Sequence, residues 1–194
     1  MTRPVTRWPI VKLTQARQVF ALMDVDEDDL PPAADDLHMR YDALRDGDTP
    51  ADALDYIAHA LPRQEAVAWA ARCLHDHART HSLPIRDQLA LDHAMRWIDE
   101  PSDTNRRATH AAAEAAGYRS PERMLGMAVF YSGGSIAPMN AAPVLAPPEA
   151  CLRYAAGAVK ASAYGSMTPG AAMAEALALA EQVAERGVEA LAKP

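Results

Sequence analysis

The amino-acid sequence predicts an all-α protein, a compact bundle of about eight or nine short helices. Hydrophobic residues make up 49% of its 194 residues but aromatic residues only 6%, and alanine dominates the apolar set. Alanine is the best helix former and a poor strand former. Helix-starting residues followed by proline recur along the chain, and no segment shows a convincing strand pattern.

The first half of the chain is predicted to hold helices over 14–23, 37–47, 48–61, 63–81 and 84–100. Capping or proline residues mark most of the helix starts: Thr14, Asp48 or Thr49, Pro50, Pro62 and Pro84. Gly47 is expected to end the second helix as a C′ glycine. The acidic segment between the first two helices is interpreted as a solvated loop.

The second half is predicted to hold helices over 104–117, 120–131, 147–165 and 169–186. The expected caps are Thr104, Ser120 and Thr168. A long loop, residues 132–148, is rich in glycine and proline but too apolar for a floppy linker. We expect a single helical domain over 1–194, with this ordered crossover as the candidate boundary between two helical halves.

Charge and hydropathy exclude several classes of function. The formal net charge is −7 and the isoelectric point about 5.4, whereas nucleic-acid binding needs a basic surface. No apolar run is long enough for a signal peptide or a membrane span. Because Cys73 and Cys151 are the only cysteines, a reducing compartment is expected. The sequence therefore predicts a cytoplasmic protein that binds neither nucleic acid nor membrane.

The segment CLHDHARTH, residues 73–81, raises the question of a metal site. On a helix over 63–81, Cys73, His77 and His81 share one side, whereas His75 and Asp76 point away. Two histidines four residues apart can bind zinc. The alternative, which the sequence favours, is that His77 and His81 lie at the end of the apolar stripe that faces the core. Their rings would then be hydrogen-bonded to the backbone or to a carboxylate. No cofactor is then expected.

A catalytic alternative rests on His75 and Asp76, which resemble the His-Asp core of the HD phosphohydrolases. Those enzymes place an adjacent histidine and aspartate on a helix to hold a divalent metal. The resemblance implies a metal-dependent hydrolase that uses the region from His59 to His93. However, His75 lies on the polar face of the expected helix, where a buried metal pocket is not expected.

Residues 52–74, DALDYIAHALPRQEAVAWAARCL, resemble an alpha-helical bacterial family of unknown function. The hallmark of that family is a Leu-Pro-Arg-x-Glu-Ala-Val-x-Trp-Ala run, which here begins at Leu61 and ends at Ala70. The downstream segment FYSGGSIAP is also similar, so the resemblance spans most of the chain after residue 37. Members are often encoded near type VI secretion components and their effectors, which implies a loading, adaptor or accessory role. The resemblance implies no activity and no catalytic residue.

The leading hypothesis is therefore a non-enzymatic helical adaptor or accessory protein whose partner is a secretion component or effector. The expected contact residues are Arg63, Trp69, Ile136, Met139 and Leu145. Trp69 is either a core wedge or an exposed anchor, and Arg63 is expected to reach a carboxylate on a neighbouring helix. A homo-oligomer that pairs through the apolar stripe of the helix over 169–186 is a third alternative.

Overall fold

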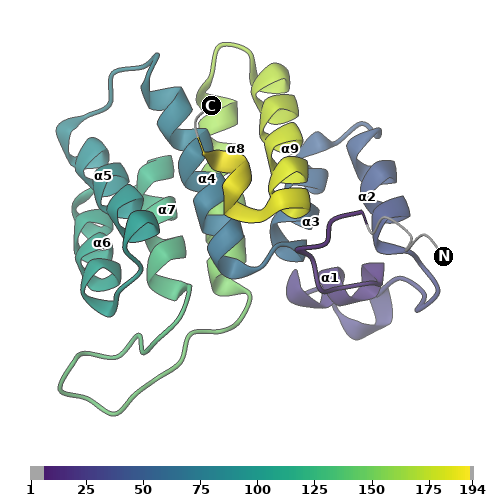
Figure 1. Ribbon diagram of the computed structural model, residues 1–194, viewed down its shortest axis with the longest axis horizontal. Coiled ribbons are helices and arrows are strands. Elements are labelled where there is room, and N and C mark those ends of the chain that lie inside the picture. Colours follow the sequence, from purple (N-terminus) through teal and green to yellow (C-terminus); the bar gives the residue numbers. More distant parts are fainter. Residues whose placement is uncertain (1–6, 193–194) are drawn as a thin grey trace.

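The computed structural model describes residues 7–192, which form nine α-helices and no β-strand (Figure 1). The helices are α1 (Ala16–Leu22), α2 (Leu37–Arg45), α3 (Pro50–Ala60), α4 (Arg63–Ala78), α5 (Ile85–Asp99), α6 (Asp103–Ala115), α7 (Pro121–Tyr131), α8 (Ala150–Gly165) and α9 (Pro169–Arg186). Two short 3-10 helices, η1 (Glu27–Asp29) and η2 (Gly187–Leu191), accompany them. The all-α prediction is confirmed. None of the helices within residues 7–192 combines the length and hydropathy needed to cross a bilayer.

Several helix starts differ from the prediction by one to three residues; helix α8, for example, was predicted from residue 147 and begins at Ala150. Helix α1 begins after Gln15 rather than Thr14, because the Gln18 side chain accepts a hydrogen bond from the backbone N–H of Gln15 at 3.0 Å. Helix α6 is capped by Ser102, whose hydroxyl accepts from a backbone N–H of the first turn at 3.1 Å. Thr104, the expected cap, already lies inside the helix.

One hydrophobic core runs through the bundle. Its buried residues extend from Trp8 to Ala184 and come from both sides of the loop over 132–148. Helices α4 and α8 lie at the centre, with α5 and α6 at one edge and α1 and α2 at the other (Figure 1). Helix α8 packs against α3, α4, α7 and α9. The loop therefore leaves and re-enters the bundle between two helices, α7 and α8, that contact each other directly.

Two contacts show how closely the helices approach. A Cβ atom added at Gly126 in α7 would lie 2.5 Å from the Cβ of Ala113 in α6, so this crossing requires glycine. Trp69 is fully buried, and its indole N–H donates to the carbonyl oxygen of Ala176 at 2.9 Å. This hydrogen bond joins α4 to α9.

The apolar stripe of α9, proposed from the sequence as an oligomerisation surface, faces the core. Met173 and Leu177 are each 4% exposed, and Ala180 is fully buried. The helix packs this stripe against α3, α4 and α8. These side chains therefore belong to the core of this chain and form no exposed surface for a second copy.

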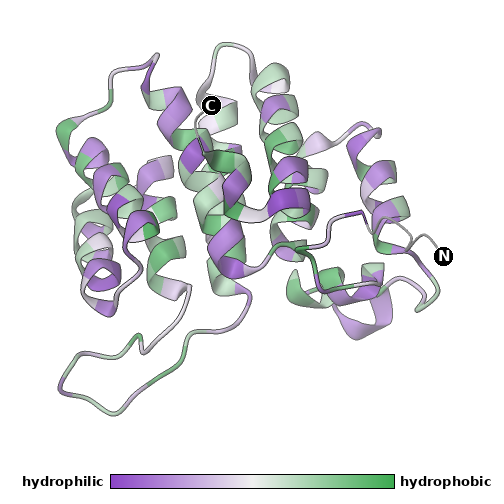
Figure 2. Ribbon diagram, viewed as in Figure 1, coloured by the Kyte–Doolittle hydropathy of each residue, from purple (hydrophilic) through white to green (hydrophobic). Residues whose placement is uncertain are grey.

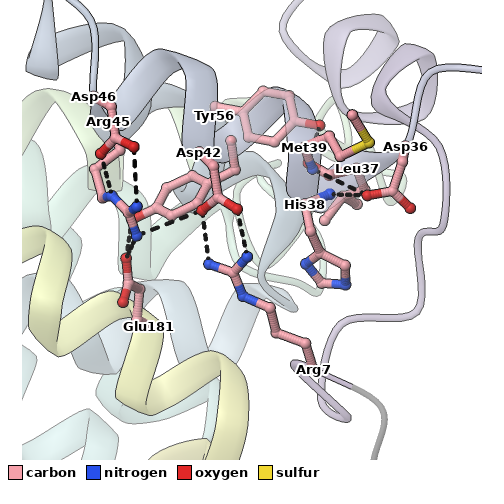
Figure 3. A network of polar contacts seen from close by, with 11 residues as sticks. Arg7, Asp36, Leu37, His38, Met39, Asp42, Arg45, Asp46, Tyr56 and Glu181 are labelled. Atoms are coloured by element: carbon pink, nitrogen blue, oxygen red, sulfur yellow. Dashed lines mark hydrogen bonds and ion pairs between the residues drawn. The ribbon is translucent and has the colours of Figure 1, made fainter. Parts of the chain in front are cut away.

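A network of polar side chains ties the N-terminal segment and α2 to α9 (Figure 3). Arg7 donates to the two carboxylate oxygens of Asp42 at 2.8 and 2.9 Å. Arg45 lies within 3.4 Å of Asp42 and 3.1 Å of Glu181, and Glu181 also accepts from the Tyr41 hydroxyl at 2.9 Å. The hydrogen bond from Arg7 holds the pKa of the Asp42 carboxyl below its ordinary value. Ionic contacts thus reinforce the core contacts of this end of the bundle.

Candidate functional site

The crossover loop, residues 132–148, has internal structure of its own. The backbone N–H of Ile136 donates to the carbonyl oxygen of Val144 at 2.8 Å. The N–H of Val144 in turn donates to the Ser135 hydroxyl at 3.0 Å, and Ser135 forms an isolated antiparallel bridge with Leu145. The two arms of the loop are therefore joined to each other as in a short hairpin.

Arg106 of α6 holds the base of the crossover loop. Its side chain is 4% exposed, and its guanidinium donates to the carbonyl oxygens of Phe130 at 2.7 Å and Ser135 at 2.8 Å. It also donates to the Asp103 carboxylate at 3.0 Å. Gly134 has a φ of +67°, and a Cβ there would lie 3.2 Å from a guanidinium nitrogen. Glycine at this position lets the chain turn closely around Arg106.

Arg107 supports the same loop from a more exposed position. Its guanidinium donates to the carbonyl oxygens of Ser135 and Ala137, both at 3.0 Å, and to Asp103 at 2.9 Å. Hydrogen bonds from Arg106 and Arg107 lower the pKa of the Asp103 carboxyl. An ionised carboxylate and two arginines of one helix therefore fix the start of the loop.

The crossover loop exposes apolar side chains at its tip, at Met139, and on its returning arm, at Val144 and Leu145. Met139 is 86% exposed, Leu145 76% and Val144 51%, whereas Ile136 is half-buried. The loop contains four prolines and no charged residue, and Figure 2 draws much of it in green. An uncharged apolar segment that projects from a bundle is the kind of surface that binds other proteins.

Trp69 and Arg63, the two contact residues expected in the hallmark run, do not belong to this exposed apolar surface. Trp69 is fully buried, so it is the core wedge of the two alternatives and not an exposed anchor. Among residues 7–192, Arg63 reaches no carboxylate; it donates to the carbonyl oxygen of Ser132 at 3.4 Å, at the C-terminal end of α7. A positive charge is favourable there because the helix dipole is negative at that end. Arg63 thus contacts the first residue of the crossover loop, near the part that Arg106 holds.

The histidine segment borders a cavity of about 520 Å³ between α4, α8 and α9, which is a second candidate site. Cys73, His77 and His81 all line it, as expected for one side of a helix. Helix α4 nevertheless ends at Ala78, so His81 lies in the following turn and its ring stacks on His77 with centroids 4.0 Å apart. Asp76 also lines the cavity, contrary to the prediction that it points away.

The contacts at this cavity support two stacked imidazoles, one of which is hydrogen-bonded to the backbone. His81 Nδ1 lies 3.1 Å from the carbonyl oxygen of His77. Burial lowers the pKa of His77, and the charge of His81 lowers it further. Burial raises the pKa of the Cys73 thiol to about 12, which keeps the thiol protonated at neutral pH. Within residues 7–192 no group of three His, Cys, Asp or Glu side chains is arranged to hold a metal ion.

The other histidines of the catalytic alternative are spread over different elements. His59 of α3 is 3% exposed, and its Nδ1 lies 2.7 Å from the carbonyl oxygen of Asp55. His93 of α5 lines a groove against α6. Neither residue lines the cavity that holds His77 and His81.

Sequence reasoning missed Asp103, Arg106 and Arg107, which build the base of the crossover loop. The sequence does contain one indication of them: an acidic residue is followed three and four residues later by two arginines, on a helix expected close to the uncharged loop. This spacing by itself predicts only ion pairs within the helix. It gives no indication that the same arginines bind loop carbonyls.

Of three comparisons with known proteins, the one with protein families gives a match. A family model described as "Family of unknown function (DUF6931)" matches residues 41–184, which is more than half of the chain. No curated protein and no solved structure matches. The matched residues include Arg63, Arg106, Arg107 and the whole crossover loop.

Proposed function

This chain belongs to the DUF6931 family of unknown function, and we propose that it is a helical adaptor that contacts a protein partner through its crossover loop. One observation supports the proposal: the loop combines a fixed base with an exposed apolar tip. Arg106 holds the base from a buried position. Met139 at the tip is 86% exposed, and Leu145, on the returning arm opposite Ser135, is 76% exposed.

The hydrogen bonds at the base stabilise the fold, but exposing Met139 and Leu145 brings it no benefit. Ordering backbone costs about 1–2 kcal/mol per residue in conformational entropy. Leaving a leucine or methionine in water forgoes about 1.5–3 kcal/mol relative to burying it. A partner that covers Met139 and Leu145 recovers that burial, and a loop that is already ordered lowers the entropic cost of binding.

The chemistry of the loop indicates the kind of groove that the partner offers. The four prolines fix φ at their positions, and such segments bind apolar grooves lined with aromatic side chains. A basic or acidic groove gains nothing from a loop without charge. We propose a type VI secretion component or effector as the partner, as the family resemblance implies, with this chain in a loading or accessory role.

Site-specific photo-cross-linking in the native host tests the proposal. A benzophenone amino acid is placed at position 139 or 145, and at position 167 as the control, because Met167 is 93% exposed but lies on the turn between α8 and α9. We expect the same discrete adduct from positions 139 and 145 and none from 167. The adduct protein is then purified, and Leu145→Asp is expected to weaken its binding at least tenfold.

The proposal fails if positions 139 and 145 yield no adduct, or if all three positions give the same bands. It also fails if the purified adduct protein binds the wild type and Leu145→Asp equally well. Circular dichroism of each variant checks that the helical fold is intact, and no change is expected because Leu145 is exposed.

A further inference from the structure

The cavity between α4, α8 and α9 is lined by two histidines whose ring nitrogens are largely unused. Within residues 7–192, neither nitrogen of His77 takes part in a hydrogen bond, and only one nitrogen of His81 does. The two rings stack with centroids 4.0 Å apart and planes 6° apart. Stacking uses the faces of the rings, so the nitrogens at their edges stay available to a ligand.

The contacts of His81 determine which of its nitrogens is free. Its Nδ1 lies 3.1 Å from the carbonyl oxygen of His77 and 2.9 Å from the hydroxyl oxygen of Thr80. That hydroxyl donates its own hydrogen to the same carbonyl at 3.0 Å. Both neighbours of Nδ1 therefore accept, so Nδ1 carries the hydrogen and Nε2 keeps its lone pair. Histidines that bind metal ions are oriented in this way, with the second ring nitrogen donating to a backbone carbonyl or a carboxylate.

The charge of the cavity suits a cation. Among the residues that the structure describes, its lining includes the carboxylates of Asp76 and Glu175 but no lysine or arginine. The Asp76 carboxylate is paired with Arg72 at 2.7 Å. Glu175 is exposed and forms no ion pair within residues 7–192. An anion in the cavity would therefore meet an uncompensated negative charge, whereas a cation would be attracted.

We propose that His77 and His81 bind one divalent transition-metal ion through a nitrogen of each ring, with water in the remaining coordination positions. Imidazole suits zinc, copper and nickel ions, whereas magnesium and calcium prefer oxygen ligands. Metal–nitrogen bonds are about 2.0–2.1 Å long, so two nitrogens on one ion lie about 3–3.5 Å apart. The stacked rings are already at nearly this separation, and His81 is exposed and free to tilt. Two protein ligands suffice, so the site needs no group of three such side chains.

This site is separate from the proposed adaptor surface. None of the crossover-loop residues lines the cavity. His77 lies in the last turn of α4, and His81 lies in the turn that follows the helix. A bound ion therefore joins the end of α4 to the next segment of the chain, whatever the loop binds.

Calorimetric titration of the untagged protein with Ni²⁺, from about 1 to 500 µM, tests the proposal. One ion is expected to bind per chain, and His77→Gln or His81→Gln is expected to weaken binding about tenfold or more. His75→Gln is the matched control, because His75 belongs to the same segment but does not line the cavity. Cys73→Ser is the second control, since the proposed ligands are imidazoles. Both controls are expected to bind as tightly as the wild type.

The order of affinities separates imidazole ligands from carboxylates. Cu²⁺ is expected to bind more tightly than Ni²⁺, and Mg²⁺ is expected not to bind. In NMR spectra of the wild type, the ring signals of His77 and His81 are expected to broaden with Ni²⁺ before that of His75. Thermal unfolding without metal checks that each variant is folded.

Three results would overturn the proposal. The first is no saturable binding of Ni²⁺ up to about 500 µM. The second is equal affinity of the wild type, His77→Gln and His81→Gln, or a loss of affinity in His75→Gln or Cys73→Ser as large as theirs. The third is Mg²⁺ binding as tightly as Ni²⁺, which would show a site made of carboxylates.

Discussion

Replacing Arg106 with alanine removes the side chain that joins α6 to the crossover loop. The carbonyl oxygen of Phe130 loses its donor at 2.7 Å, in a region where the arginine is 4% exposed. The carbonyl oxygen of Ser135 loses a donor at 2.8 Å but keeps the one that Arg107 provides at 3.0 Å. Leaving a buried acceptor without a partner costs about 1–3 kcal/mol. The Asp103 carboxylate is 59% exposed, so loss of that ion pair adds little.

We therefore expect Arg106→Ala to lower the free energy of unfolding by about 2 kcal/mol, within a range of about 1–4. For a chain of this size that corresponds to a fall in Tm of about 6 °C. Urea unfolding followed by circular dichroism measures the change. Arg107→Ala, whose side chain is 24% exposed, is expected to cost about 1 kcal/mol.

The control is Arg119→Ala, because Arg119 is exposed and a surface substitution changes stability by less than about 0.5 kcal/mol. Arg106→Lys is expected to lie between wild type and Arg106→Ala, since lysine has a single charged nitrogen and cannot serve both carbonyls as a fork. A loss below about 1 kcal/mol for Arg106→Ala, similar to that of Arg119→Ala, would refute the role assigned to Arg106.

Three further predictions concern the bundle. Gly126→Ala is expected to lower the free energy of unfolding by about 1–3 kcal/mol, because the added Cβ would lie 2.5 Å from the Cβ of Ala113. Gly170→Ala, in open space on α9, is expected to raise it by about 0.5 kcal/mol. Urea unfolding measures both, and a more stable Gly126→Ala than Gly170→Ala would contradict this. Trp69→Phe loses the indole hydrogen bond to a buried carbonyl and is expected to cost about 1–3 kcal/mol in the same assay, with no measurable cost as the contrary result. Burial lowers the pKa of His59 in the folded protein, so below about pH 6.5 the unfolded chain binds a proton that the folded chain does not. The free energy of unfolding therefore decreases as the pH is lowered, by up to about 1.4 kcal/mol per pH unit. Unfolding free energies measured between pH 7 and 5 should fall less steeply for His59→Leu, and an unchanged slope would show that this histidine is not responsible.

Helix positions could be predicted because their signals are local. Pro50, Pro121 and Pro169 each lie in the first turn of a helix, where proline is favoured whatever surrounds it. The prediction failed where two candidate caps stood close together, as with Ser102 and Thr104, since both are good N-caps in isolation.

The base of the candidate site could not be predicted in the same way. Arg106 and Ser135 are 29 residues apart, and their hydrogen bond depends on how α6 packs against α7. Trp69 lies at the flank of an apolar face, so helical spacing left its burial open until the position of α9 was known. The exposed apolar side chains of the loop were easier to predict, because a long apolar segment without charges or helical periodicity has no local way to bury Met139 or Leu145.

Amide hydrogen exchange of the wild-type protein tests most directly whether the crossover loop is a fixed platform with an exposed tip. The amides of Ile136 and Val144 donate to partners within the loop at 2.8 and 3.0 Å, so they are expected to exchange about 100-fold or more slowly than in an unfolded chain. The amide of Met139 at the tip is expected to exchange near the unfolded rate. Equal, fast exchange at all three positions would show a flexible linker and contradict the proposed adaptor surface.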